Sequence, residues 1–234
     1  MGKSIACLQN ALDMSESVVA VTGAGISVSA GISGFDGMDF LTVMQMSSVK
    51  VLQRVPEHYY RMARKAFLDQ MFYKGPTLSH YKLADWETSG RIKGIITTNI
   101  DCLHGLAGST NVAEIQGSFG VNECLDCGKR YCDVRIWNQG HMPRCLNCDG
   151  LIAPYPVSNH LRLLEEDVAL ARDILSNADL VMFIGTNGPY CGTYIDYLDP
   201  YARIVQINPK RTQFDEIADI NLHATADEIM SSLH

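Results

Sequence analysis

The stretch VVAVTGAGIS, residues 18–27, decides the fold of this chain. Residues 18–22 form a short apolar run rich in β-branched side chains, which predicts a buried strand. Gly23 and Gly25, with the small residues that follow them, predict a tight turn leading into a helical segment. Backbone N–H groups in such a turn, together with a helix N-terminus, can bind a pyrophosphate. A turn of this type can also serve only the close packing of strand and helix, so the motif needs further support.

Outward from this stretch, strand-like runs alternate with helical patterns. Apolar runs predict strands at residues 94–98, 112–115, 180–184 and 204–207, and helical spacing predicts helices within 75–91, at 161–175 and at 226–233. Most of the strand runs are apolar throughout, as in parallel strands covered on both faces. We therefore expect an α/β fold with a doubly wound, Rossmann-like parallel sheet. The Met-rich and aromatic segment 35–74 is expected to form a loop and helices whose methionines fill the core.

Residues 122–156 interrupt the alternation, because they hold five of the eight cysteines and show no helical period. Two CxxC pairs lie 17 residues apart, which is the spacing of a four-thiolate zinc site formed by Cys124, Cys127, Cys145 and Cys148. A closed set of four thiolates leaves no open position for catalysis, so the zinc is expected to be structural. Two disulfides, or Cys132 in place of one ligand, are the alternatives. We expect a small zinc-ribbon module at 122–156, inserted into a Rossmann-like domain formed by 1–121 and 157–234.

Composition and charge exclude several classes of protein. The 234 residues are 47% hydrophobic and 19% charged, with a net charge of −7 and no block of five basic residues, which argues against a nucleic-acid-binding surface. The longest apolar runs are strand-sized, far below the roughly 18 residues that span a bilayer. The N-terminal residues lack the apolar core and cleavage site of a signal peptide. We expect a cytoplasmic protein that binds neither nucleic acid nor membranes.

An ordered set of motifs along the whole chain resembles the sirtuin family. The family's motifs GAGxSxxSGIPDFR, TQNIDxLH, HGS and GTS are similar to GAGISVSAGISGFDG at 23–37, TTNIDCLH at 97–104, QGS at 116–118 and GTN at 185–187. The CxxC pairs and VQIN at 205–208 complete the order. The resemblance implies an NAD-binding Rossmann-like domain, an inserted zinc-ribbon module, NAD as co-substrate, and a cleft for a protein acceptor between the two.

The same resemblance implies site residues by matching position. Asn99 and Asp101 would hold the nicotinamide end of NAD, and Gln116 would lie at the ribose. The residues implied to bind the rest of the cofactor are Gly23, Ala24, Gly25, Ser27, Phe35, Thr98, Gly185, Thr186, Asn187 and Asn208. Asp101 is chemically as plausible an N-cap of the following helix as a ligand. His104 matches the family pattern, and we expect it to be an internally bonded helix residue rather than a base.

Departures from the family pattern bear on the reaction. Gln116 stands where the family has its catalytic His, which in the deacylase scheme activates a ribose hydroxyl after the substrate amide oxygen has attacked the ribose. A Gln amide cannot take that proton near neutral pH. In addition, SGFD at 33–36 replaces PDFR, Thr98 replaces the Gln of TQN, and APYPVSNH at 153–160 replaces an acceptor-clamping segment that usually ends in FGE.

These departures favour ADP-ribosyl transfer to a protein acceptor as the main hypothesis. Cleavage of the nicotinamide–ribose bond needs orientation and a dry pocket around Phe35 more than it needs a base. Some sirtuins that share the Gln and an altered loop are macrodomain-linked ADP-ribosyltransferases acting on a lipoyl-carrier protein, so the resemblance implies a partner of that kind. The alternatives are a protein-lysine deacylase in which another group replaces the His, and a catalytically inactive sensor of NAD or ADP-ribose.

Overall fold

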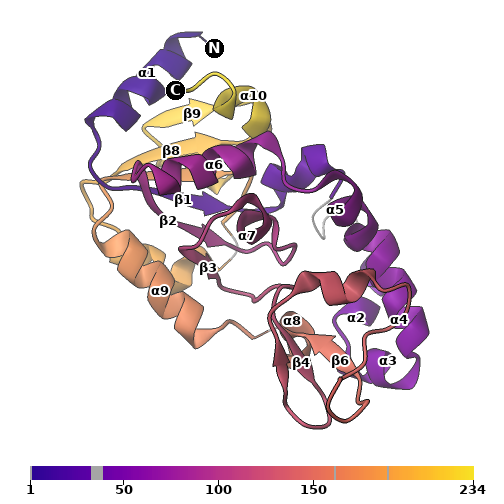
Figure 1. Cartoon of the computed structure of the whole chain (residues 1–234). Coiled ribbons are helices and arrows are strands. Elements are labelled where there is room, and N and C mark those ends of the chain that lie inside the picture. Colours follow the sequence, from indigo (N-terminus) through magenta and orange to yellow (C-terminus); the bar gives the residue numbers. More distant parts are fainter. Residues whose placement is uncertain (1, 33–38, 161, 189) are drawn as a thin grey trace.

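In the computed structural model, six parallel strands form a central sheet in the order β3-β2-β1-β7-β8-β9 (Figure 1). The structure describes residues 2–32, 39–160, 162–188 and 190–234. The strands are β1 (Val18–Thr22), β2 (Ile92–Thr97), β3 (Val112–Glu114), β7 (Leu180–Ile184), β8 (Arg203–Ile207) and β9 (Ile220–Leu222). The predicted doubly wound sheet is confirmed. The sequence patterns missed β9, a three-residue edge strand whose central Asn221 is polar.

The strand order reverses beside β1, which pairs with β2 on one edge and with β7 on the other. Thr22, the last residue of β1, lies opposite Thr97 of β2 and Ile184 of β7. The carboxyl ends of these three strands therefore meet at one place. In doubly wound sheets, ligands bind in the crevice at such a reversal point.

Helices cover both faces of the sheet (Figure 1). One face packs against α1 (Gly2–Met14), α6 (Leu78–Thr88) and α10 (Ala226–Met230), and the other packs against α9 (Glu165–Ser176). Alternate side chains of β1 point to opposite faces, so Val18 joins the first core and Val19 the second. Because both faces are covered by apolar cores, the central strands β1 and β7 are buried along their whole length, as the sequence indicated for most strands. Helix α10 ends three residues before the predicted boundary at 233.

Short helical elements connect the strands at the edges of the sheet. The turn after β1 continues as the 3-10 helix η1 (Ala24–Ala30), and β2 is followed by α7 (Leu103–Ala107). Three further 3-10 turns lie near the C-terminal half of the sheet: η5 (Cys191–Thr193), η6 (Ile195–Tyr197) and η7 (Gln213–Glu216). In the described residues, helices long and apolar enough to span a bilayer are absent.

A second layer lies beside the sheet and contains most of segment 39–74 together with the cysteine-rich region (Figure 1). Its helices are α2 (Phe40–Met46), α3 (Val49–Arg54), α4 (Pro56–Ala63), the π-helical turn η3 (Arg64–Leu68) and α5 (Asp69–Lys74). Met46 and Met71 are buried there, as predicted for core methionines, whereas Met44 is 54% exposed and departs from the prediction. The small antiparallel sheet has the order β5-β4-β6, with β4 (Asn122–Cys124), β5 (Arg130–Tyr131) and β6 (Ile152–Pro154); η4 (Val134–Asn138) and α8 (Tyr155–Ser158) complete the region.

Trp137 joins the small sheet to the helices beside it. Its ring is fully buried, stacks on Tyr60 of α4, and meets Phe119 edge-on at 5.2 Å between ring centroids. Its indole N–H donates to Asn122 Oδ1 at 2.7 Å, which satisfies the buried polar group. The cysteine-rich region is therefore held by an aromatic cluster as well as by its own strands.

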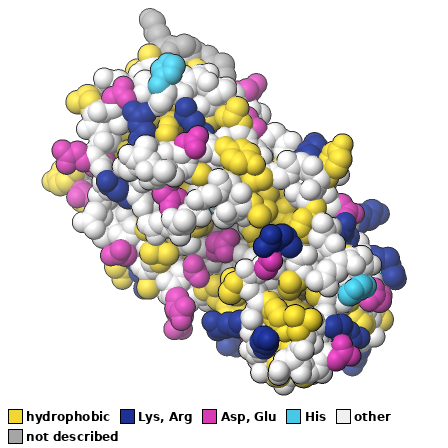
Figure 2. Space-filling view, viewed as in Figure 1, with side chains coloured by type: hydrophobic (Ala, Val, Ile, Leu, Met, Phe, Trp, Pro, Cys, Tyr) yellow, Lys and Arg dark blue, Asp and Glu magenta, His cyan; other side chains and the backbone are white. Residues whose placement is uncertain are grey.

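On the face shown in Figure 2, Lys and Arg side chains are dispersed among Asp and Glu.

Candidate functional site

Two glycine turns meet at the reversal point of the sheet. The Gly25 N–H donates to the carbonyl oxygen of Gly185 at 2.8 Å. A Cβ on Gly25 would lie 2.5 Å from the Cα of Gly185, and Gly185 itself has a φ of +60°, which favours glycine. The turn after β1 and the turn after β7 therefore touch backbone to backbone. Residues of the two predicted cofactor-binding motifs, far apart in sequence, form one surface.

Asn99, Ser27 and Asp101 form a buried polar group beside these turns. The Asn99 amide nitrogen donates to the Gly23 carbonyl oxygen at 3.2 Å and to Ser27 Oγ at 3.3 Å. The Ser27 hydroxyl donates in turn to Asp101 Oδ2 at 2.7 Å. Three residues assigned from the sequence are thus held in one hydrogen-bonded chain.

Asp101 also bonds to the start of α7, since its Oδ1 accepts the Leu103 N–H at 3.1 Å. The N-cap of α7 is Cys102, so the N-cap hypothesis for Asp101 was wrong by one residue; its carboxylate nevertheless bonds the first N–H of the helix and still faces Ser27. Burial raises the pKa of Asp101, while the hydrogen bonds from Ser27 and Leu103 act in the opposite direction. A buried carboxylate held by two donors is oriented rigidly, as a ligand-positioning group must be.

The remaining predicted cofactor residues occupy the same edge of the sheet with differing exposure. Thr186 is buried and its hydroxyl accepts the Gly188 N–H at 3.0 Å, while Asn208 donates to the Thr186 carbonyl oxygen at 3.3 Å. Ala24 and Thr98 are partly exposed, and Asn187 is exposed. Phe35 and its neighbours at 33–36 lie outside the described residues. The described members gather around the carboxyl ends of β1, β2, β7 and β8.

Gln116 lies in a tight turn just past β3 and is partly exposed. Gly117 follows it with a φ of +68°, and the Gly117 N–H donates to the Glu114 carbonyl oxygen at 2.6 Å. Within the described part of the chain, the Gln116 side chain makes no hydrogen bond. This turn holds the position where the resemblance places a ribose contact.

Glu114, which the sequence reasoning did not single out, lies beside the turn that carries Gln116. It is the last residue of β3, and its Oε2 accepts the Ser118 hydroxyl at 2.6 Å. Burial raises the pKa of Glu114 to about 7, with Asp167 and Asp101 adding to the effect and the Ser118 hydrogen bond opposing it. The available signal was a lone carboxylate at the carboxyl end of an apolar strand, two residues before Gln116.

A buried histidine pair lies behind the glycine turn. His104 Nε2 lies 2.8 Å from the Thr22 hydroxyl, and the His104 and His80 ring centroids are 4.7 Å apart. His80 Nδ1 accepts the Thr77 N–H at 3.2 Å, and burial lowers the pKa of His80 to about 4. Burial, with the neighbouring His80, also lowers the pKa of His104 well below its usual value. His104 is thus a neutral, internally bonded helix residue, as expected.

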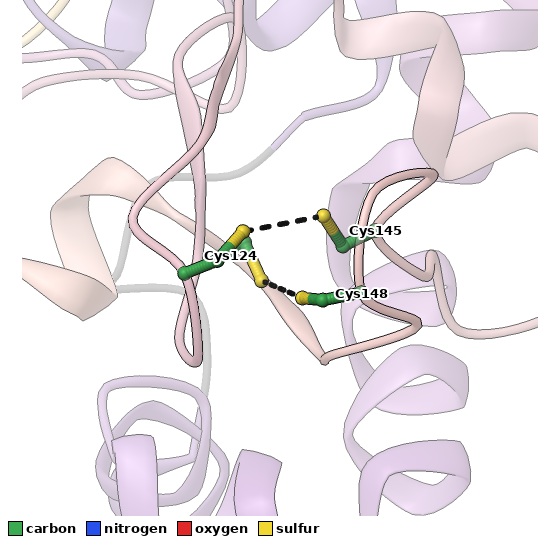
Figure 3. Close-up of side chains that lie close together, drawn as sticks. Cys124, Cys145 and Cys148 are labelled. Atoms are coloured by element: carbon green, nitrogen blue, oxygen red, sulfur yellow. Dashed lines mark hydrogen bonds between the residues drawn. The ribbon is translucent and has the colours of Figure 1, made fainter.

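The four predicted cysteines cluster at the ends of two loops (Figure 3). Their sulfur atoms all lie within 4.8 Å of one another, with 3.5 Å between Cys124 and Cys148 and 3.6 Å between Cys127 and Cys145. Four thiolates at 2.3 Å from a tetrahedral zinc would have sulfurs about 3.8 Å apart, so the cluster fits the ion. Sulfur separations of 3.5 and 3.6 Å are too long for a disulfide bond, which favours zinc binding over the alternative of two disulfides. Cys132 is exposed and lies outside the cluster.

Comparison with known proteins identifies the family. The model of the Sir2 family matches residues 23–189, which is more than half of the chain. The chain is a sirtuin. An NAD-dependent protein deacetylase of Clostridium perfringens is 30% identical to it over 247 residues, covering 100% of this chain and 99% of the relative. An NAD-dependent protein deacylase of Pyrococcus furiosus is 32% identical over 237 residues, covering 95% and 93%.

Solved Sir2 structures are similar over almost the whole chain. A Sir2 bound to a p53 peptide and NAD+ has a TM-score of 0.77 at 29% identity, covering 96% of this chain and 94% of that one. A complex of Sir2 with the inhibitor EX-527, 2'-O-acetyl-ADP-ribose and deacetylated p53 peptide has a TM-score of 0.77 at 28% identity, covering 97% and 96%. The predicted family, fold and NAD co-substrate are confirmed, and the cysteine cluster is a structural zinc site. The names of the relatives favour deacylation, the alternative hypothesis, over ADP-ribosyl transfer.

Proposed function

We propose that this sirtuin is an NAD-dependent protein-lysine deacylase. The observation that carries the proposal is the match to deacetylases and deacylases over almost the full length of both chains. The residues of the candidate site are compatible with this reaction, because the glycine turns and the buried Asn99–Ser27–Asp101 chain lie at one edge of the sheet. The protein acceptor is an acyl-lysine segment in this proposal.

Each part of the site has a defined task in the proposed reaction. The two glycine turns that contain Gly23 and Gly185 line the pyrophosphate, and Asn208 binds the adenosine ribose. Asn99 and Asp101 orient the nicotinamide end, so that the bond between nicotinamide and ribose breaks in a fixed geometry. The zinc has four protein ligands and takes no part in the chemistry; it holds the loops that carry Cys124 and Cys145.

ADP-ribosyl transfer is the second candidate, and Gln116 is the observation that favours it. An acceptor that is already nucleophilic can attack the ribose without a base, whereas deacylation needs a proton acceptor. The choice between the two therefore depends on whether another group replaces the missing His.

One assay separates the candidates. The protein is incubated with NAD and an acetyl-lysine peptide, and in parallel with NAD and a lipoyl-carrier protein, and products are identified by mass spectrometry. We expect nicotinamide, deacetylated peptide and acetyl-ADP-ribose in equal amounts. ADP-ribose attached to the carrier protein, with the peptide unchanged, would contradict deacylation and support ADP-ribosyl transfer instead. NAD binding without nicotinamide release would contradict both reactions and leave the hypothesis of a catalytically inactive NAD sensor.

A further inference from the structure

Three carboxyl groups from separate elements surround the carboxyl end of β3. Glu114 ends the strand, Asp101 comes from the loop after β2, and Asp167 lies in the first turn of α9, where its Oδ1 accepts the Glu114 N–H at 3.0 Å. The ion pairs found among the described residues involve none of the three. Negative charge is therefore concentrated at this strand end without a neutralising cation in the described structure, a condition that favours retention of a proton.

One oxygen of the Glu114 carboxyl accepts a hydrogen bond within the protein, and the other oxygen is available as an acceptor. Oε2 accepts the hydroxyl of buried Ser118, and the Ser118 oxygen in turn accepts the Gly120 N–H at 3.2 Å. Oε1 has no hydrogen-bond partner within the ranges that the structure describes, and the side chain is only partly buried. The carboxyl is thus oriented by the turn that carries Gln116 and still presents one acceptor oxygen.

The surroundings of Glu114 suit a proton acceptor that works near neutral pH. Burial is the largest cause of its raised pKa, Asp167 and Asp101 raise it further, and Ser118 lowers it, for a value of about 7. The Cys102 thiol, on the loop after β2, also faces this carboxyl, and its own pKa is raised well above the usual value, mainly by burial and next by Glu114. Cys102 is therefore neutral here. A base transfers protons best when its pKa is close to the working pH.

We infer that Glu114, oriented by Ser118, is the proton acceptor that replaces the family's histidine. The inference rests on the proposed deacylase function. As a ribose hydroxyl attacks the carbon that comes from the acyl amide, its O–H bond breaks. The electron pair of that bond forms the new C–O bond, the π bond between this carbon and the lysine nitrogen opens onto the nitrogen, and the proton passes to Glu114 Oε1. Gln116, two residues further along the chain, occupies the position of the histidine and can hydrogen-bond the ribose, but it cannot accept the proton.

The first test titrates Glu114 directly and does not depend on activity. In protein with ¹³C-carboxyl-labelled glutamate, the Glu114 resonance is assigned by its loss in Glu114→Gln and followed from pH 4 to 9. We expect a midpoint near pH 7. Asp167→Asn removes a negative neighbour and should move the midpoint to lower pH, whereas Ser118→Ala removes a donor and should move it to higher pH. Glu165→Gln, an exposed position in the same turn of α9, is the matched control and should leave it in place.

The second test follows deacylation of an acetyl-lysine peptide against pH. Wild-type rates should rise through the Glu114 midpoint, and the Asp167→Asn rise should move to lower pH by the shift seen in the titration. Glu114→Gln should lose about a hundredfold or more of the rate at pH 8 and lose the rise. Glu114→Asp should recover part of both, which distinguishes proton transfer from structural support. NAD affinity, measured by calorimetry, should change less than threefold in Glu114→Gln.

The outcomes separate this inference from the function on which it rests. Wild-type protein that forms no acetyl-ADP-ribose at any pH overturns the proposed deacylase and, with it, this role of Glu114. Wild-type deacylation that persists in Glu114→Gln with an unchanged pH profile overturns the role of Glu114 alone. A Glu114 midpoint below pH 5, or a pH profile that ignores Asp167→Asn, overturns it as well.

Discussion

At the scale of single residues, the site is defined by side chains with more than one hydrogen bond. Asn99 is bonded to the backbone of the glycine turn and to Ser27, which belongs to the helical turn after it. Its amide plane is therefore fixed before any ligand binds. Such preorganisation is what gives a positioning residue its effect on rate.

Asn99→Ala should abolish nicotinamide release while the fold persists. The substitution removes both hydrogen bonds and the group proposed to orient the scissile end of NAD, so we expect the rate to fall by at least about a hundredfold. Nicotinamide is quantified by chromatography, and circular dichroism checks the fold. Asn177→Ala, at the C-terminal end of α9, is the control. Unchanged turnover in Asn99→Ala would remove this residue from the site.

Gly25→Ala should weaken NAD binding through a backbone clash. The new Cβ would lie 2.5 Å from the Cα of Gly185, so the two turns must separate. We expect the dissociation constant for NAD, measured by calorimetry, to rise at least about tenfold. Gly105→Ala in α7 is the matched control, because a Cβ there meets no atom within 4 Å. Equal NAD affinity in the two variants would contradict the contact between the turns.

At the scale of elements, the start of α6 is tied to the glycine turn by buried polar groups. The Thr77 hydroxyl donates to the Ile26 carbonyl oxygen at 3.1 Å, and His80 completes a capping box with Thr77. His80 and His104 then connect this helix start to Thr22 at the end of β1. Helix α6 therefore supports the turn only while both imidazoles remain neutral.

Acid should destabilise the protein through His80. Its pKa is about 4 in the fold and about 6.5 in the unfolded chain, so the unfolded chain binds more protons between these values. Stability therefore falls as the pH drops from 6.5 to 4, by up to about 3 kcal/mol. The raised pKa of Glu114 has the opposite effect, because it adds stability as the pH falls. Wild type is therefore compared with His80→Gln, which retains Glu114, by urea unfolding at pH 7, 6 and 5. The stability difference should shrink with falling pH, and a constant difference would contradict the assignment.

Features that depend on residues close in sequence could be predicted, whereas features that depend on residues far apart in sequence could not. Strands β1 and β7 were predicted with their observed ends because both are buried on two faces and bounded by turn residues. The four cysteine ligands were predicted because metal geometry restricts their spacing. Glu114 was missed because its environment depends on Asp167, 53 residues away, and on Asp101. Its raised pKa is a property of three elements together, which no local pattern records.

At the scale of the whole molecule, the sheet domain and the cysteine-rich region share one aromatic cluster. Phe119, three residues before the start of β4, contacts both Trp137 and Phe67 of η3. The zinc site lies at the far side of this cluster, among few buried apolar residues. The fold of the loops around the metal therefore depends on the ion, whereas the position of Trp137 is fixed by packing against Tyr60 of α4 and Phe119.

The protein should bind one zinc per chain, and Cys145→Ser should lower both zinc content and the yield of folded protein. A missing thiolate weakens the site, and the binding free energy of a structural zinc is part of the folding free energy. Zinc is measured by atomic emission and folded protein by size-exclusion chromatography. Cys132→Ser, which lies outside the cluster, should bind zinc as the wild type does. A folded, zinc-free protein after mild chelation would contradict the prediction.

The contact between the glycine turns also determines when the site can exist during synthesis. Strand β7 and its turn follow β1 by about 160 residues, so at about 5 to 20 residues per second the ribosome needs roughly 8 to 30 s to make the second half of the pyrophosphate wall. Until then β1 has a free edge on the side that β7 later occupies. The nascent chain can pair β1, β2 and β3 and fill the zinc site, yet it has no binding surface for NAD. Co-substrate can therefore stabilise this protein only once β7 and its turn have left the exit tunnel.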